Sequence, residues 1–515
     1  MKNKLAVFAL AALSIVGMTG CTGTKDSKPT EVIWWNNYQV PDSTVSEEEG
    51  RKSSTYREYY YAKDLIAAFE SEHKDIKITT VYKGSYNDIK SAVDSALNGG
   101  SLPTMVSCYA DSAYPWSEAG AVVDMNDAIS ELKNDSDFNQ KYLTAEKGMY
   151  GNGPVLTLPF SKSGETFVYN ETLFNKVGAG KAGTDTTDSK GNAVYTAPVA
   201  KDTKTQYSVP TNWNEMIALA RKMKEDFPDV FAEQKDKDGY FQAVPFCWDS
   251  TENMIISLLK NANIKYTASG DKISDRVLFN NEEAKKLVVQ LKKWNNEGLI
   301  CTQNQLMLTN AAKGYHAYGS SLFANGKIFM SISSTAGARY FTNDGYLANM
   351  TKTLAWDDGD QKNVKVMSQG PSLCFLGKKG SDAQKAAFTF YKYLTNTENS
   401  AKLAVNTSYF PLRSSAADTE EVKALTTAAA TKPSDNASSS DKGKYYSGVV
   451  MKLNDTYSTD DSYFLSPVTK ESSKCRTAIG GLINTVFDNK DAKTDEEITA
   501  VVEEAFKTAF DSITK

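Results

Sequence analysis

Short strand-like segments and longer helix-like segments alternate near the start of the chain, and this alternation restricts the possible folds more than any other feature. Apolar runs of strand length lie at residues 32–35, 76–78 and 105–108. Apolar residues recur at helical spacing in residues 62–69 and 86–97. The order strand, helix, strand, helix, strand predicts a doubly wound parallel sheet, which binds ligands at the carboxyl ends of its strands.

A similar alternation begins again further along the chain and predicts a second α/β unit. The chain has 515 residues, which is too many for a single hydrophobic core and agrees with at least two compact units. We expect helices capped by Thr211 and Ser381, a helix closed by Gly298, and a C-terminal helix opened by a capping box from Thr494 to Glu497. The predicted fold class is therefore α/β.

Three polar stretches interrupt this pattern. They lie at Val40–Ser54, Gly178–Ser208 and Thr426–Lys444. Small, polar or charged residues dominate each of them, and this composition is typical of surface loops. We therefore expect three loops that carry no function of their own.

The N-terminal residues have the features of an export signal. A short positive region precedes the apolar run Leu5–Val16, whose twelve residues are too few to cross a bilayer of about 30 Å. Small and polar residues then lead to Cys21. This arrangement resembles bacterial lipoprotein signals, which implies a signal peptide at 1–20, lipidation of Cys21 and a lipid-anchored stalk at 21–30. The alternative is an ordinary secretory peptide cut nearby, and in both cases the remaining chain lies outside the cytoplasmic membrane, at the cell surface or in a periplasm.

The charge pattern and the scarcity of reactive residues argue against several function classes. Acidic and basic residues are interspersed with a net charge of −5, so we expect no nucleic-acid partner. The chain has only two histidines, His73 and His316, and widely spaced cysteines, so we expect no metal, no cofactor and no enzymatic activity. A glycoside hydrolase with paired carboxylates is the enzyme alternative. Five cysteines follow Cys21; since five is odd, at least one thiol is unpaired, and we expect most of them to be buried.

Five short motifs follow one another along the chain. They are Tyr82-Lys83-Gly84-Ser85-Tyr86, Pro159-Phe160 with Tyr169-Asn170, Asn212-Trp213-Asn214-Glu215, Phe323-Ala324-Asn325-Gly326-Lys327 with Met330, and Thr407-Ser408-Tyr409-Phe410-Pro411. Each motif alone is weakly specific. In this order they resemble the extracellular solute-binding proteins of ABC importers, in the group that binds sugars and glycerol phosphate, and the likeness extends over nearly the whole chain after the signal.

The resemblance implies two α/β lobes of the type II periplasmic-binding-protein fold with a ligand cleft between them. The implied N-terminal lobe comprises residues 31–161 and 366–398, and the implied C-terminal lobe comprises residues 162–365 and 399–515. A small-molecule solute closes the lobes of such proteins, and the closed monomer docks on the transmembrane subunits of an ABC permease. A receptor that feeds no importer is an alternative, because a fold does not determine a function.

The resemblance also implies ligand contacts at specific positions of this chain. They are Tyr86, Ser163, Ser334, Thr335, Gly370 and Tyr409. Hydroxyl groups both donate and accept hydrogen bonds, tyrosine rings stack on sugar faces, and glycine lets a backbone N–H approach a ligand. Strand ends and aromatic side chains add the candidates Trp35, Tyr109, Asp111 and Trp248. At every one of these positions, ordinary packing or loop geometry is the alternative.

Two departures from the glycerol-phosphate binders favour a neutral carbohydrate. Those proteins carry a glutamate where this chain has Ala110, and their arginine before the C-terminal region has no clear counterpart, since the neighbourhood is Leu465-Ser466-Pro467-Val468. Arginine is the natural bidentate partner of a phosphate. The candidate replacements are Lys162, Lys470, Lys474 and Arg476. We therefore predict a mono- or oligosaccharide ligand, with glycerol 3-phosphate or a glycerophosphodiester as the alternative.

Overall fold

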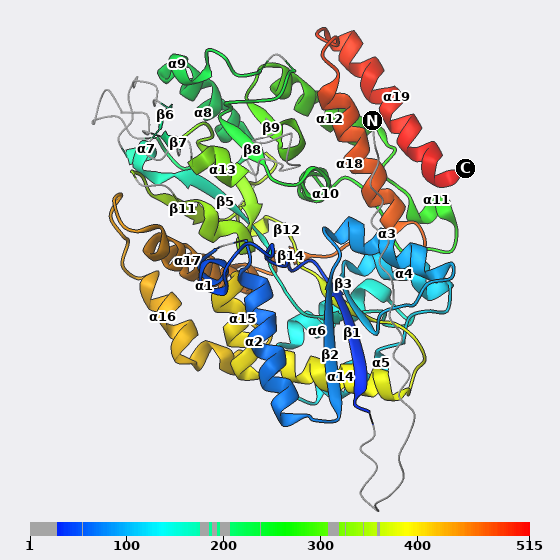
Figure 1. Cartoon of the computed structure of the whole chain (residues 1–515). Helices are drawn as coiled ribbons and strands as arrows, with labels where there is room; N and C mark the ends of the chain where they lie inside the picture. Colours follow the sequence, from blue (N-terminus) through cyan, green and yellow to red (C-terminus); the bar gives the residue numbers. More distant parts are fainter. Residues whose placement is uncertain are drawn as a thin grey trace, which may run out of the picture.

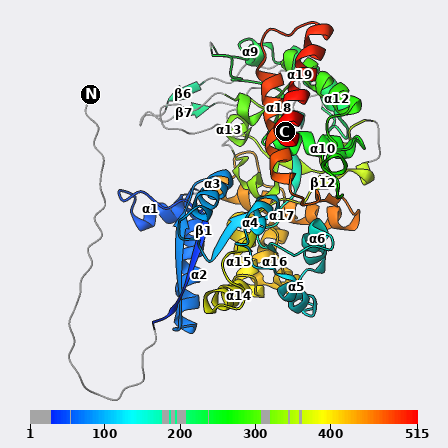
Figure 2. The same cartoon turned by 90° about the vertical axis from the view of Figure 1, so that its right-hand side faces the viewer.

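The computed structural model describes residues 28–515, except residues 54, 176–184, 188–192, 196–206, 237, 307–318, 325, 343–344 and 358–360. Two α/β lobes lie one above the other, the lower around the sheet that begins with β1 (Thr30–Asn36) and the upper around the sheet that contains β5 (Glu165–Asn170) (Figure 1, Figure 2). The predicted signal peptide, Cys21 and most of the predicted loop Gly178–Ser208 lie outside the described residues.

The first lobe is built on a five-stranded sheet with the strand order β2-β1-β3-β13-β4. The other strands of this sheet are β2 (Ile76–Tyr82), β3 (Met105–Cys108), β4 (Leu158–Pro159) and β13 (Ser372–Phe375). β2 and β3 run parallel to β1, as the alternation predicts, whereas β13 runs antiparallel to β3 and β4. The sheet is therefore mixed and not wholly parallel, because the chain returns from the second lobe to form β13 in the opposite direction.

Among the described residues, seven helices belong to the first lobe, and all of them except α1 contribute buried apolar residues to its core. They are α1 (Glu47–Lys52), α2 (Arg57–Glu72), α3 (Tyr86–Leu97), α4 (Ala110–Glu118), α5 (Asn126–Lys133), α6 (Gln140–Tyr150) and α14 (Asp382–Leu394). Trp34 of β1 meets Phe390 of α14 edge to face, with ring centres 6.0 Å apart. The predicted cap of α14 is confirmed, since the Ser381 hydroxyl accepts a hydrogen bond from the Gln384 N–H.

One of the predicted loops contains a helix. The stretch Val40–Ser54 includes α1, so the loop prediction is wrong for its second half. Ser46 and Glu49 form a capping box there, and acidic residues in the first turn with Arg51 in the last turn complement the helix dipole. The stretch Thr426–Lys444 likewise contains the end of one helix and the start of another.

The second lobe is built on another five-stranded sheet, with the strand order β11-β5-β10-β8-β9. The remaining strands are β8 (Phe246–Trp248), β9 (Ile300–Thr302), β10 (Met330–Ser334) and β11 (Ala348–Thr351). β8, β9 and β10 run parallel, and β5 runs antiparallel to β10 and β11. Two small additional pairs are β6 (Asp185–Thr187) with β7 (Ala193–Tyr195) and β12 (Val366–Met367) with β14 (Tyr463–Phe464).

Tryptophan side chains form the centre of the second core. The helices of this lobe are α7 (Glu171–Asn175), α8 (Trp213–Asp226), α9 (Pro228–Phe231), α10 (Thr251–Asn261), α11 (Ile273–Arg276), α12 (Glu282–Asn296), α13 (Gly319–Ala324), α18 (Ser472–Asp488) and α19 (Asp495–Thr514). The Trp213 ring stacks on Trp248 at 6.1 Å and on Trp294 at 5.9 Å between ring centres. These contacts join α8, β8 and α12.

The predicted helix ends of this lobe are confirmed in two of three cases. Gly298 adopts a left-handed φ of 69° just after α12, and Thr494 with Glu497 forms the capping box of α19. The prediction that Thr211 caps α8 is wrong, because Asn212 lies one residue nearer and its side chain accepts from the Glu215 N–H. The Thr211 hydroxyl instead donates to the Glu215 carboxylate at 3.0 Å.

Three further helices run alongside both lobes. They are α15 (Thr397–Thr407), α16 (Glu420–Ala428) and α17 (Ser439–Thr459), coloured yellow to brown at the lower left of Figure 1. α15 packs beside α2 of the first lobe, and α17 packs on β11 of the second. This helical group therefore contacts both α/β units.

Three chain segments pass between the lobes side by side. Their positions are residues 160–165, 367–372 and 408–411. The Gln369 N–H donates to the Ser163 carbonyl at 2.8 Å, and the Phe410 N–H donates to the Lys162 carbonyl at 2.7 Å. The crossing segments, which together we call the hinge, are therefore hydrogen-bonded to one another between the lobes.

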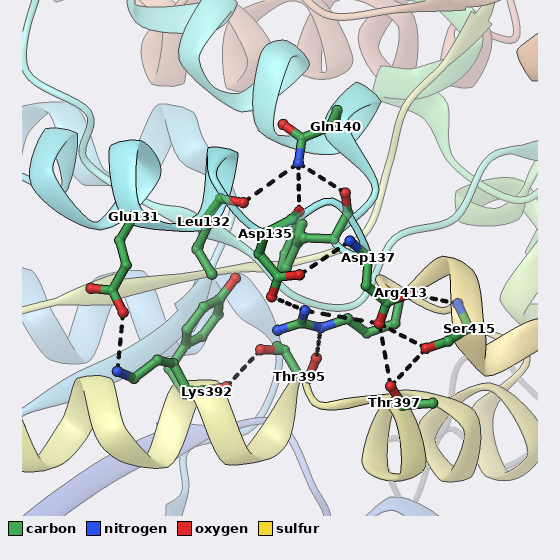
Figure 3. A network of polar contacts seen from close by, with 12 residues as sticks. Glu131, Leu132, Asp135, Asp137, Gln140, Lys392, Thr395, Thr397, Arg413 and Ser415 are labelled. Atoms are coloured by element: carbon green, nitrogen blue, oxygen red, sulfur yellow. Dashed lines mark hydrogen bonds and ion pairs between the residues drawn. The ribbon is translucent and has the colours of Figure 1, made fainter.

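A polar network ties the segment after the third crossing to the first lobe (Figure 3). Arg413 forms an ion pair with Asp135, and the Ser415 hydroxyl donates to Asp137 at 2.7 Å. The first core also contains Phe410 and Leu412. Residues 410–415 thus pack with the first lobe, and the predicted lobe boundary at residue 398 stays a prediction.

All five cysteines of the described chain are buried and none forms a disulfide. They are Cys108, Cys247, Cys301, Cys374 and Cys475. The expectation that most of them pack as small apolar side chains is confirmed. Within the described residues, no helix is both long and apolar enough to span a membrane.

Candidate ligand-binding site

Two cavities lie between the lobes, and Asn253 and Gln369 line both of them. The larger, which we call the carboxylate cavity, encloses about 1500 Å³, including the part open to solvent. Its polar and aromatic lining residues include Glu58, Glu165, Trp248, Asp249, Ser333, Ser334 and Tyr340. The smaller, which we call the arginine cavity, encloses about 750 Å³. Its lining residues include Tyr109, Asp111, Lys162, Tyr266, Ser372 and Arg476.

Glu165 is a buried carboxylate at the wall of the carboxylate cavity. One carboxylate oxygen accepts from the Trp248 indole N–H at 3.0 Å, and the other accepts from the Ser257 hydroxyl at 3.1 Å. Burial raises the pKa of Glu165 to about 7, although these hydrogen bonds favour the charged form. Its side chain is therefore close to its protonation midpoint at neutral pH.

Asp249 is the second carboxylate of this cavity and directly follows β8. It accepts from the Ser333 hydroxyl and from the Gly319 N–H, each at 2.7 Å. Burial raises its pKa to about 6. Each of its oxygens accepts one of these hydrogen bonds and has a second lone pair, so the carboxylate retains the capacity to accept hydrogen bonds from ligand hydroxyls.

The raised pKa of Glu165 predicts that stability depends on pH. Between pH 4.5, its ordinary pKa, and about 7, the folded protein binds more protons than the unfolded chain. Glu165 therefore contributes favourably to the free energy of unfolding below about pH 4.5. This contribution, which is at most about 3 kcal/mol, is lost as the pH rises through about 7.

Urea unfolding at pH 5 and pH 8 checks this expectation. Glu165→Gln keeps the shape of the side chain and removes the titrating group, so its free energy of unfolding should fall less between the two pH values than that of the wild type. Glu283→Gln, at an exposed position of α12, is the matched control and should behave like the wild type. An equal fall in Glu165→Gln and wild type would show that Glu165 is not the titrating group.

The arginine cavity brings a guanidinium from α18 against the first lobe. The Arg476 guanidinium lies 5.4 Å from the ring centre of Tyr109 and donates to the Asn253 side-chain oxygen Oδ1 at 2.5 Å. Burial lowers the pKa of Arg476, but Asp111, Tyr109, Glu252 and Tyr266 together raise it more, so the guanidinium stays charged. Burial raises the pKa of Asp111, and the charge of Arg476 opposes this shift.

Lys162 lines the same cavity but its charge is already paired. Its ammonium lies 3.0 Å from a Glu146 carboxylate oxygen and 2.9 Å from the Ser372 hydroxyl. Glu146 also accepts from Thr157. This buried pair links α6 to the first and second crossing segments.

The structure places five of the ten predicted ligand-binding residues at the two cavities, and some of the others contact these five. The rings of Tyr86 and Tyr109 lie 5.0 Å apart, and the Tyr86 hydroxyl is hydrogen-bonded to Tyr409. The hydroxyl oxygens of Ser163 and Ser334 lie 3.3 Å apart. Asp111 and Tyr109 line the arginine cavity, and Trp248 and Ser334 line the carboxylate cavity.

The other predicted positions differ in what they face. The Thr335 hydroxyl is buried and accepts from the Gly164 N–H at 3.1 Å. Gly370 lines the arginine cavity and adopts a left-handed φ of 91°. Trp35 lies in neither cavity; its ring is half-buried on β1, with the Lys83 ammonium 4.1 Å from the ring centre. The ligand contacts themselves stay predictions.

Sequence reasoning missed several lining residues. The set comprises Asn253, Gln369, Asp249 and Glu58, and Arg476 was only a candidate replacement for a missing arginine. Asp249 directly follows β8, and the rule that ligands bind at the carboxyl ends of parallel strands is the signal that points to it. For Asn253 and Gln369 no sequence motif exists, because their role depends on contacts between distant segments.

Sequence comparisons relate the chain to known proteins. The sequence profile described as bacterial extracellular solute-binding protein matches residues 64–430. The sn-glycerol-3-phosphate-binding periplasmic protein UgpB of Agrobacterium fabrum is 22% identical over 393 residues, which cover 74% of this chain and 74% of that protein.

Solved structures with low sequence identity share the fold. The maltose/maltodextrin-binding domain MalE from Bdellovibrio bacteriovorus bound to maltotriose has a TM-score of 0.61 at 15% identity, covering 94% of this chain and 100% of that chain. UgpB from Mycobacterium tuberculosis in complex with glycerophosphocholine has a TM-score of 0.59 at 13% identity, covering 94% and 99% of the two chains. At such identities the likeness shows the two-lobed fold alone.

Proposed function

Because this chain belongs to the bacterial extracellular solute-binding proteins, we propose that it captures a carbohydrate between its lobes and delivers it to the permease of an ABC importer. Membership of the family places the chain outside the cytoplasm. The ligand is a mono- or oligosaccharide, and it holds the lobes of the monomer closed until the permease receives it.

The lining of the carboxylate cavity is the observation that supports a neutral sugar. Carboxylates, hydroxyls, amides and the Trp248 indole form its walls, and none of its described lining residues is a lysine or an arginine. Carboxylates such as Glu165 and Asp249 accept hydrogen bonds from sugar hydroxyls and repel phosphate. Trp248 and Tyr340 add apolar surface of the kind on which a sugar ring packs.

The arginine cavity supports the second candidate, a glycerol 3-phosphate or glycerophosphodiester ligand. Arg476 supplies a guanidinium of the type that binds phosphate in a bidentate manner. The Agrobacterium relative is a glycerol-3-phosphate-binding protein, and the Mycobacterium tuberculosis UgpB structure holds glycerophosphocholine. Against this reading, Arg476 already lies beside Asp111, whose negative charge weakens the attraction for a phosphate.

A thermal-shift screen tests the choice between these ligands. The protein comprising Thr22–Lys515 is heated with glucose, maltotriose, glycerol 3-phosphate or glycerophosphocholine. A ligand present at about 100 times its dissociation constant adds about 2.7 kcal/mol to the free energy of unfolding. We expect the melting temperature to rise with a neutral sugar. A rise only with the phosphate esters would overturn the carbohydrate proposal, and no rise with any of them would favour a different solute.

Small-angle X-ray scattering tests the transport mechanism separately. If ligand closes the lobes, the radius of gyration should decrease when a sugar that raises the melting temperature is added. A receptor that feeds no importer would also close, so loss of sugar uptake on deletion of the partner permease genes distinguishes the two. Tight binding without contraction would contradict lobe closure.

We also propose that Cys21 carries a lipid that anchors the protein to the membrane. The arrangement of the N-terminal residues supports this proposal, since an apolar run too short to span the bilayer ends just before Cys21. In cells that express the full chain, Cys21→Ser should move the protein from the membrane fraction to the soluble fraction. An unchanged membrane fraction would favour another form of attachment.

A further inference from the structure

Three polar side chains form a chain of hydrogen bonds between the two cavities. An Arg476 N–H of α18 donates to the side-chain oxygen Oδ1 of Asn253 on α10 at 2.5 Å. The Asn253 amide N–H then donates to the Gln369 side-chain oxygen at 2.8 Å. Gln369 belongs to the second crossing segment, so this series of hydrogen bonds connects the second lobe to the hinge.

The direction of these hydrogen bonds is determined by the arginine. A guanidinium has donors and no acceptor, so the atom of Asn253 that faces it must be oxygen. The nitrogen of Asn253 then faces Gln369, and the atom of Gln369 that receives its hydrogen bond must in turn be oxygen. The Gln369 Nε2 group is therefore left as a free donor.

This donor lacks a partner. The Gln369 Nε2 atom is buried, and among the described residues no atom accepts a hydrogen bond from it. A buried donor without an acceptor is unfavourable, and an acceptor brought by a ligand relieves this cost. Gln369 lines both cavities, so a molecule bound in either one can reach its side chain.

We propose that the Gln369 side-chain amide is a specificity-determining donor to the bound solute, an inference that rests on the proposed function. The atom it recognises is an acceptor oxygen, such as a hydroxyl or ring oxygen of a carbohydrate. Arg476 and Asn253 are positioning residues, because they turn the nitrogen of Gln369, and not its oxygen, toward the solute. Asn253 is also hydrogen-bonded to Glu165, so the positioning chain touches the carboxylate cavity as well.

A single substitution of Gln369 tests the donor. Gln369→Glu keeps the acceptor for Asn253 but replaces the free N–H group with an oxygen that repels the acceptor of the solute. Isothermal titration with maltotriose, glucose, glycerol 3-phosphate and glycerophosphocholine should show binding at least about 10-fold weaker for every probe that the wild type binds. Gln290→Glu, on α12 and outside both cavities, is the matched control and should bind like the wild type.

A double-mutant cycle tests the positioning residues. In Asn253→Asp, both oxygens of the new carboxylate are acceptors, so Gln369 must rotate its amide and present its oxygen to the solute. This variant should lose about as much affinity as Gln369→Met, which has no donor, and the double variant should bind no more weakly than Gln369→Met alone. If Asn253 has only a structural role, the fold-losses of affinity in the two single variants should instead multiply in the double variant. Thermal unfolding of each variant identifies any that fails to fold. If a variant of the cycle fails to fold, the titration of Gln369→Glu tests the proposal by itself.

The outcomes separate this proposal from the proposed function. If the wild type binds one of the probes and Gln369→Glu binds it equally well, Gln369 is not a ligand donor and the proposal is wrong. If the losses in the cycle multiply, Asn253 does not orient Gln369. If the wild type binds none of the four probes, the proposed function fails, and the proposal that rests on it fails with it.

Discussion

Replacing Lys162 with methionine is expected to lower the free energy of unfolding by about 3–5 kcal/mol. Lys162 is 5% exposed and Glu146 is 1% exposed, and their charged groups lie 3.0 Å apart. Removing the ammonium leaves the Glu146 carboxylate without its counter-charge in the interior of the first lobe. The cost of an unpaired buried charge is much larger than the net value of the pair itself.

Urea unfolding followed by tryptophan fluorescence measures this loss. Lys402→Met is the matched control, because the Lys402 ammonium lies 2.6 Å from Glu398 in an exposed pair on α15. Pairs of that kind contribute less than about 0.5 kcal/mol, so the control should unfold almost like the wild type. Combining Lys162→Met with Glu146→Gln should recover part of the loss, since the amide carries no charge. A loss below about 1 kcal/mol in Lys162→Met would contradict a buried ion pair at this position.

The α/β framework was predictable from the sequence because local patterns determine it. The first three strands and the helices between them follow from apolar periodicity, and caps such as Ser381 follow from the local need of a helix to pair its first N–H groups. The error at Thr211 is also local, since Asn212 competes for the same role one residue away. Alternation alone does not show the direction of β13, because that depends on where the chain returns from the other lobe.

The site was less predictable, because it depends on contacts between distant segments. Trp35 and Trp248 both follow short apolar runs, yet Trp248 faces the carboxylate cavity and Trp35 lies outside both cavities. Arg476 and Gln369 are separated by more than a hundred residues and are linked only through Asn253. No local pattern distinguishes such residues from ordinary surface polar groups.

The second large effect is expected at the hinge, where Gly370→Ala should cost more than about 3 kcal/mol and abolish detectable sugar binding. Gly370 has a φ of 91°, and a Cβ atom there would lie 1.7 Å from the Ser161 carbonyl oxygen. An L-residue at such a φ costs about 1–3 kcal/mol by itself, and the contact adds to it because the backbone must move. Ser161 and Gly370 lie on neighbouring crossing segments, so this movement displaces the cleft residues on both of them.

Gly377→Ala separates the two contributions, because Gly377 has a similar φ of 105° but no atom within 4 Å of the position a Cβ would take. It should lose only the 1–3 kcal/mol of backbone strain and retain its affinity for the sugar found in the screen. The difference between the two variants, measured by urea unfolding and by titration, is then the effect of the contact with Ser161. Equal stability losses with unchanged affinity in Gly370→Ala would mean that the crossing segments can separate at Gly370 without disturbing the cleft. In that case the tight packing of the hinge would not be what holds the binding residues in place.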